Sequence, residues 1–108
     1  MAKLERTFTG DFDTLLQKIE DGVLSGSVSA SLEEAADYAA SNSRCSVRVF
    51  ERHSWSGSNR VSMNVTLYQA GDTIHLCAIT SGGSQATFFK INTLGEEAFL
   101  ETLENILP

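Results

Sequence analysis

The feature that most constrains the fold is a period of two in hydrophobicity between residues 44 and 81. Three runs in this span alternate apolar with polar residues, at 45–50, 61–68 and 74–79. Such alternation is typical of β-strands, because successive side chains point to opposite faces of a sheet. Gly, Ser, Asn and Asp residues at 54–59 and 70–72 separate the runs as turns. We therefore predict a three-stranded antiparallel meander at 44–81.

Helices are predicted on either side of this meander. Behind Asp11 as capping residue, one apolar stripe follows a helical period: Phe12, Leu15, Leu16, Ile19 and Val23. Gly22 is expected to end this helix. Near the C-terminus, Thr93 and Glu96 fit a capping box that opens a second helix, with its glutamates, Glu96 among them, on the outer side. Residues 4–8 alternate as a short strand in front of the first helix.

Two segments admit more than one interpretation. Residues 27–32 alternate as an edge strand, whereas Ser31 and Glu34 also fit a capping box at the start of a short Ala-rich helix. We predict a short strand followed by a helical turn, and a longer strand through Tyr38 is the alternative. Residues 86–91 read as extended, so they are candidates for a further strand after a turn at 81–84.

These elements define the predicted fold class. With 108 residues the chain suffices for one domain over 1–108, and a second core would be too small to stand alone. We predict an α+β fold with an antiparallel sheet of four to five strands, the meander at 44–81 among them. The N- and C-terminal helices are expected to pack on one face of this sheet.

Charge and composition exclude several classes of partner. Fourteen acidic side chains against eight basic ones give a net charge of −6, which disfavours binding to nucleic acid or an anionic membrane. No run approaches the ~20 apolar residues of a membrane span, and the N-terminus lacks a signal peptide. Two cysteines are too few for a disulfide framework. We expect a cytoplasmic protein with reduced thiols.

Strand register decides which residues share a face. Setting Val65 opposite both Val47 and Leu76 gives one almost wholly apolar face, which we expect beneath the helices. In this register Cys45 and Cys77 fall on opposite faces, so neither a disulfide nor a shared metal is expected. The other face is mixed and carries Arg48, Phe50, Arg52, Arg60 and His75, with Tyr68 nearby.

The arginines of this mixed face are the strongest functional signal. Four of the five arginines lie within residues 44–60, and the register sets Arg52 opposite Arg60. A like-charge pair of this kind costs a few tenths to about 1 kcal/mol, so an external anion or carboxylate is expected to compensate it. Alternatively, Glu51 or the acids at 33–37 pair with the arginines inside the chain. The candidates for anion or partner binding are Arg48, Arg52, Arg60, Phe50, Tyr68 and His75.

Catalytic and cofactor chemistry find little support. Glu51 and His53 are two residues apart, but their spacing places no nucleophile beside them. His75 and Cys77 share a predicted face and supply only two metal ligands. The Gly-rich segment 81–84 precedes residues that read as extended, whereas phosphate loops open a helix. We therefore predict no enzyme activity, no metal and no cofactor.

Three stretches carry a resemblance to a known family. They are residues 49–52, residues 60–67 and residues 81–100, which read SGGSQATFFKINTLGEEAFL. The last resembles the C-terminal signature of a small uncharacterised bacterial family of about this length, a domain of unknown function. The resemblance covers the whole chain. It implies a bacterial cytoplasmic protein and carries no activity and no functional residues.

The functional expectation follows from these exclusions. We expect a non-enzymatic interaction or oligomerisation module, a homo-oligomer and most simply a dimer, assembled through the mixed sheet face. The alternative is a protein that binds a small anionic or amphiphilic ligand in a pocket between sheet and helices, with arginines at the anionic group.

Overall fold

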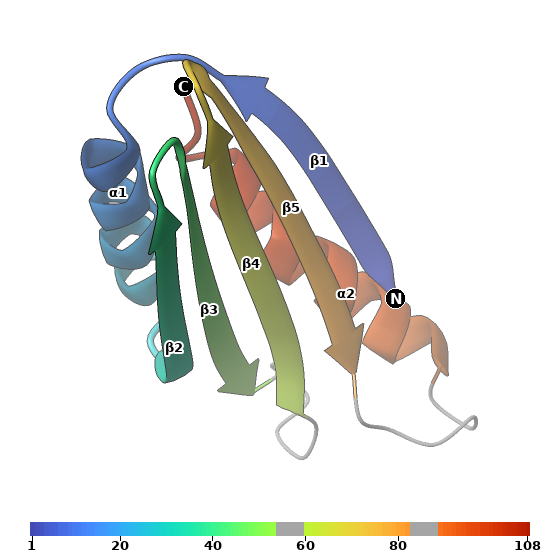
Figure 1. Ribbon diagram of the computed structural model, residues 1–108. Coiled ribbons are helices and arrows are strands. Elements are labelled where there is room, and N and C mark those ends of the chain that lie inside the picture. The colour runs from blue at the N-terminus through green and yellow to red at the C-terminus, as the bar shows by residue number, and fades with distance from the viewer. Residues whose placement is uncertain (54–59, 83–88) are drawn as a thin grey trace.

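The computed structural model describes residues 1–53, 60–82 and 89–108. The elements along the chain are β1 (Ala2–Phe8), α1 (Phe12–Ser25), β2 (Ser31–Ala40), β3 (Ser43–His53), β4 (Arg60–Ala70), β5 (Thr73–Gly82) and α2 (Phe89–Glu104). All strand pairs are antiparallel, in the order β1-β5-β4-β3-β2 (Figure 1). The predicted α+β class, with an antiparallel sheet and a meander near 44–81, is confirmed.

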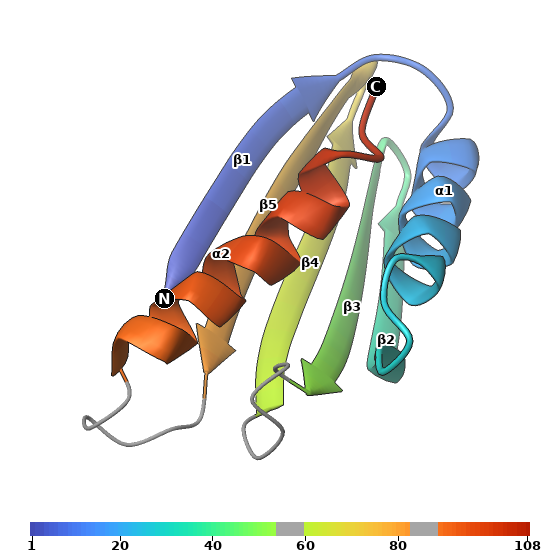
Figure 2. The same cartoon turned by 180° about the vertical axis from the view of Figure 1, so that it is seen from behind.

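The first and second strands occupy opposite edges of the sheet. Leu4 of β1 lies opposite Ala78 of β5, so the strand predicted at 4–8 completes the sheet at the β5 edge. α1 then carries the chain across to β2 at the other edge. In Figure 2, α2 runs obliquely across β1, β5 and β4, and α1 lies beside β2 and β3. No helix in the described ranges is long and apolar enough to cross a membrane.

α1 follows its predicted stripe but ends later than expected. The Asp11 carboxylate accepts a hydrogen bond from the Thr14 backbone N–H at 2.8 Å, which confirms the cap. Its buried side chains are Phe12, Leu15, Ile19 and Val23. The predicted stop at Gly22 is wrong, because the helix continues to Ser25. A Cβ atom at Gly22 would collide with Ile106 after α2, so this glycine permits close packing rather than ending the helix.

Residues 31–40 form a strand, so the predicted helical turn is wrong and the longer strand through Tyr38 is correct. β2 pairs with β3 along its length, with one bulge between Leu32 and Glu34. The hydroxyl of Ser31 bonds to the Glu33 carboxylate instead of capping a helix. Pairing with the free edge of β3 gives hydrogen-bond partners to the backbone groups of β2 that point toward β3, and this outweighs a local capping signal.

The described part of α2 is already helical at Phe89, four residues before the predicted start at Thr93. The extended interpretation of 86–91 is therefore wrong for residues 89–91, while residues 86–88 and the predicted turn at 54–59 lie outside the described residues. Glu96 was expected on the outer side, yet it is buried. Its carboxylate accepts hydrogen bonds from the backbone N–H of Gly82 at 2.7 Å and the amino group of Met1 at 2.6 Å. Glu96 thus ties α2 to the sheet.

The register differs from the prediction. Val65 lies opposite Arg48 and Ala78, not opposite Val47 and Leu76. The shift of one residue between β3 and β4 reverses the faces of β3, whereas the shift of two between β4 and β5 leaves the faces of β5 unchanged. One face, which we call the helix side, therefore carries Arg44, Ser46, Arg48, Phe50 and Arg52 of β3. The other, which we call the open face, carries Cys45, Val47, Val49, Glu51 and His53.

The physical reason for this register lies in the helices. α1 supplies Asp13 and Glu20 to the arginines of β3, so polar side chains can face it without losing their partners. A register chosen only by placing apolar residues of neighbouring strands opposite one another does not take these carboxylate partners into account. Two further predictions are wrong because they depended on the predicted register. Cys45 and Cys77 lie on the same face, the open face, both as free thiols. Arg52 lies opposite Val61 rather than Arg60.

Candidate functional site

The six predicted site residues separate into two groups. Arg48, Phe50 and Arg52 belong to the helix side, where Phe50 is fully buried in the core. The open face carries the remaining three, Arg60, Tyr68 and His75. The single mixed face expected from the sequence is therefore two separate regions.

Arg48 occupies the centre of the helix side. Its Nε donates to the Glu20 carboxylate of α1 at 2.6 Å, and its Nη1 lies 3.0 Å from the Asp37 carboxylate of β2. Burial alone would lower the pKa of Arg48, but the hydrogen bonds to Glu20 and Asp37 raise it above its ordinary value. Arg48 therefore remains charged and links α1, β2 and β3.

Other arginines are also paired within the chain. Arg44 contacts the Asp13 carboxylate at 2.6 Å, and its guanidinium lies over the Phe12 ring at 4.3 Å from the ring centroid. On the open face, Arg60 pairs with Glu51 and lies 4.0 Å from Glu33. The contacts of Arg60 match the internal pairing with Glu51 or the acids at 33–37 that the sequence left as an alternative, whereas Asp13 is not among those acids.

These ion pairs predict a pH dependence. Hydrogen bonds from Ser46 and Arg48 lower the pKa of the Asp37 carboxyl in the folded state. A lowered folded-state pKa means that the stabilisation is fully present above the unfolded value, about 3.9, and is lost as pH falls through the folded value. We expect the urea midpoints of the wild type and Asp37→Asn to differ most near neutral pH and to converge below about pH 4. A difference that stays constant over this range would contradict the pairing.

The open face carries a patch of aromatic and aliphatic side chains. We call it the open-face patch, and its members are Tyr38, Val47, Val49, Tyr68, His75 and Ile79. Tyr38, Tyr68 and Ile79 are 67 %, 42 % and 39 % exposed. Among the described elements, none lies over this face (Figure 1). The patch is therefore accessible over β2, β3, β4 and β5.

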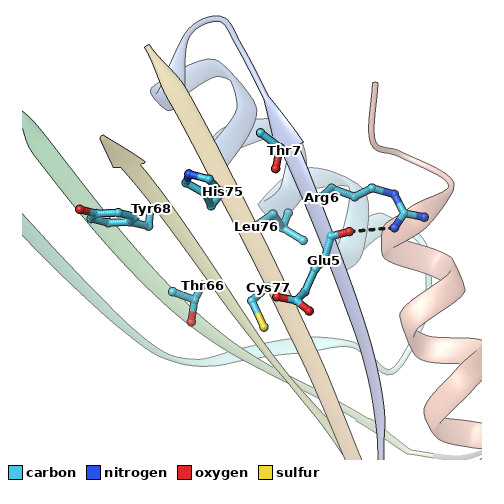
Figure 3. Close-up of a pocket in the computed structure, with 8 residues that line it drawn as sticks. All are labelled: Glu5, Arg6, Thr7, Thr66, Tyr68, His75, Leu76 and Cys77. Atoms are coloured by element: carbon cyan, nitrogen blue, oxygen red, sulfur yellow. Dashed lines mark hydrogen bonds between the residues drawn. The ribbon is translucent and has the colours of Figure 1, made fainter. Parts of the chain in front are cut away.

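A shallow groove crosses one side of this face. Figure 3 shows Tyr68 and His75 side by side, with ring centroids 6.3 Å apart and an interplanar angle of 23°. The groove has a volume of about 410 Å³ and is lined by Glu5, Arg6, Thr7, Thr66, Tyr68, His75, Leu76 and Cys77. His75 and Cys77 share this face as predicted. Within the described residues, no three His, Cys, Asp or Glu side chains gather as a possible metal site.

A separate cavity lies on the helix side, where β1 and β5 meet the start of α1. Its volume is about 220 Å³, and its lining is Phe8, Thr9, Asp11, Thr14, Leu15, Lys18, Ile74 and Pro108. None of the arginines of β3 is in this lining. This cavity therefore does not combine a pocket with the arginine cluster, as the sequence predicted for a site between sheet and helices.

The sequence did not identify Val47, Val49 and Tyr38 as surface residues. The predicted register places Val47 and Val49 in the core, and the predicted short strand ends before Tyr38. One feature of the sequence could have indicated the correct register. Asp13 and Glu20 lie seven residues apart, on one face of the predicted helix, where they can pair with arginines of a strand that faces this helix.

Comparisons with known proteins agree with the resemblance carried by residues 49–52, 60–67 and 81–100. Searches of curated proteins and of solved structures gave no match. A family of unknown function (DUF6054) matches residues 1–108, the full length given. The chain belongs to this family of unknown function, DUF6054.

Proposed function

We propose that this chain is a non-enzymatic self-association module whose open-face patch binds the same patch of a second copy. The observation that carries the proposal is an accessible surface of tyrosines and aliphatic side chains over β2 to β5, on the face that the described helices leave open. The centres of protein interfaces are depleted of charged residues and enriched in tyrosine. Tyr38, Tyr68 and Ile79 supply the exposed apolar area of this surface.

Charge favours a second copy as the occupant. In a two-fold dimer each patch faces itself, so a patch with net charge would repel its partner. The chain carries −6. Of the charges that flank the patch, Lys3 pairs with Glu5 at 3.3 Å and Arg60 pairs with Glu51, whereas Glu34, opposite Val49, makes no ion pair within the described chain. Exposed acidic residues such as Asp21, Glu97 and Glu101 lie instead on the helices. The open face is thus the part of the surface best suited to meet its own copy.

The β2 edge of the sheet is less suited to association than the open face. The β2 edge carries Glu33, Glu34 and Asp37, and a bulge interrupts its pairing near Glu34. Charged side chains and bulges at an edge oppose pairing with another strand. Association is therefore expected through the side chains of the open face rather than through the backbone of the β2 edge.

The test is sedimentation equilibrium of the wild type, Ile79→Asp and Val28→Asp. The wild type is expected at twice the mass of the 11.7 kDa chain. Ile79→Asp places a carboxylate against its own copy and is expected to weaken association by about a hundredfold or more. Val28 is fully exposed outside the sheet, so Val28→Asp makes the same chemical change away from the patch and leaves the dimer intact.

Far-UV circular dichroism and urea unfolding confirm that Ile79→Asp is folded before its mass is interpreted. Tyr68→Asp, on the neighbouring strand, provides a second variant and is expected to behave in the same way. A wild type that remains a monomer, or a folded Ile79→Asp that associates as strongly as Val28→Asp, would overturn the proposal.

A further inference from the structure

We propose that Arg52 binds a small phosphate-class oxyanion on the helix side, at the junction of β3, α2 and the end of α1. Arg6, Arg44, Arg48 and Arg60 each lie within 4.0 Å of a carboxylate. The described residues include every Asp and Glu of the chain, and none of them pairs with Arg52. Arg52 is thus the arginine whose charge the described chain leaves without a counter-ion.

Burial makes this missing counter-ion significant. Arg52 is half-buried on the helix side of β3, and loss of hydration lowers its pKa. Arg48 is more deeply buried on the same strand, but Glu20 and Asp37 offset its lost hydration. A half-buried guanidinium without a carboxylate is destabilising, and an anion bound from solution removes that cost.

The guanidinium is held in a fixed plane. Its Cζ atom lies 4.6 Å from the ring centroid of Phe99, a fully buried residue of α2. Its Nη1 donates to the Thr102 hydroxyl oxygen at 3.4 Å, and that hydroxyl donates to the Ala98 carbonyl at 3.1 Å. Phe99 and Thr102 are therefore positioning residues. The hydrogen bond to Thr102 is the only one that Arg52 donates within the described chain. A guanidinium carries five N–H groups in a planar fork, a geometry that suits a tetrahedral oxyanion.

The surroundings favour a small anion over a partner protein. The end of α1 lies against this point, since a Cβ atom at Gly26 would come within 2.6 Å of the Thr102 methyl carbon. The Ser29 hydroxyl accepts a hydrogen bond from the His53 backbone N–H at 3.2 Å and so fixes the α1–β2 connection to the end of β3. Arg52 is thus recessed among three elements, where a tetrahedral oxyanion can approach the fork more readily than a folded partner. The site does not share residues with the open-face patch.

The experiment titrates inorganic phosphate into the full chain at constant ionic strength, with potassium chloride as the reference salt. Binding is followed by ³¹P NMR line broadening and by the shift in Tm, because a ligand that binds only the folded state raises Tm. With the wild type and with Arg60→Gln, we expect the ³¹P signal of phosphate to broaden and the Tm of the protein to rise. Arg60→Gln removes the same charge on the open face, so it is the matched control. Arg52→Gln is expected to lose both responses.

Two further arms separate fork recognition from simple charge. Arg52→Lys keeps the charge but loses the planar fork. Its affinity for phosphate is expected to fall by about tenfold or more. Without phosphate, Arg52→Gln is expected to unfold at the same urea midpoint as the wild type or at a higher one, because it removes an uncompensated charge. A wild type that responds to phosphate no more than to chloride, an Arg52→Gln that still responds, or acetate that binds as well as phosphate would overturn the proposal.

Discussion

Phe50→Ala is expected to lower the free energy of unfolding by about 3–5 kcal/mol, the largest effect of any substitution considered for this chain. Phe50 is fully buried on β3, opposite Met63 of β4, which is also fully buried. Truncation removes a fully buried aromatic side chain from the core and leaves a cavity, because the surrounding structure relaxes only partly. Urea unfolding of the two proteins, followed by circular dichroism, measures the difference.

Val49→Ala is the matched control because it changes the adjacent residue of the same strand. Val49 lies half-buried on the open face, opposite Asn64, so its truncation is expected to cost about 1 kcal/mol or less. A register shifted by one residue would exchange the two side chains and reverse the order of the two effects. A larger loss for Val49→Ala than for Phe50→Ala would therefore show that the β3–β4 pairing is wrong.

Arg48→Ala is expected to have the second-largest effect, a loss of about 3 kcal/mol. Removing Arg48 leaves the Glu20 and Asp37 carboxylates without their shared cation between α1 and β2. It also deletes hydrogen bonds to the carbonyls of Ala36 and Val47. Because these partners are partly exposed, water recovers some of the loss, which places the effect near the lower end for buried ion pairs.

The control for Arg48→Ala is Arg60→Ala, since Arg60 makes its ion pairs at an exposed site. Exposed pairs contribute about 0–1 kcal/mol, so this variant is expected to stay close to the wild type. In a double-mutant cycle, Glu20→Ala should cost much less when Arg48 is already alanine, because the two side chains act as one unit. Additive effects of Arg48→Ala and Glu20→Ala would contradict a direct contact.

The candidate sites were only partly predictable. The sequence identified Tyr68, which belongs to the proposed self-association surface, and Arg52, which belongs to the proposed oxyanion site. It predicted both residues on the same face of the sheet, whereas they lie on opposite faces. Their separation follows from a single one-residue choice in the β3–β4 pairing. Apolar matching favoured Val47 opposite Val65, whereas the folded chain sets Arg48 there because Glu20 of α1 lies within reach. A contact between residues 28 positions apart leaves no periodic trace in a sequence.

What the sequence determined by itself is the set of elements that local physics specifies. The alternation in 44–81 and the stripe from Phe12 to Val23 each arise from the backbone period of one element, so they can be read without knowing its neighbours. The tertiary structure decided the strand at 31–40, the burial of Glu96 and the face on which each arginine lies. The strand depends on the free edge of β3, Glu96 on the Gly82 backbone N–H, and the arginines on carboxylates from other elements. Such interactions exist only once the chain has folded.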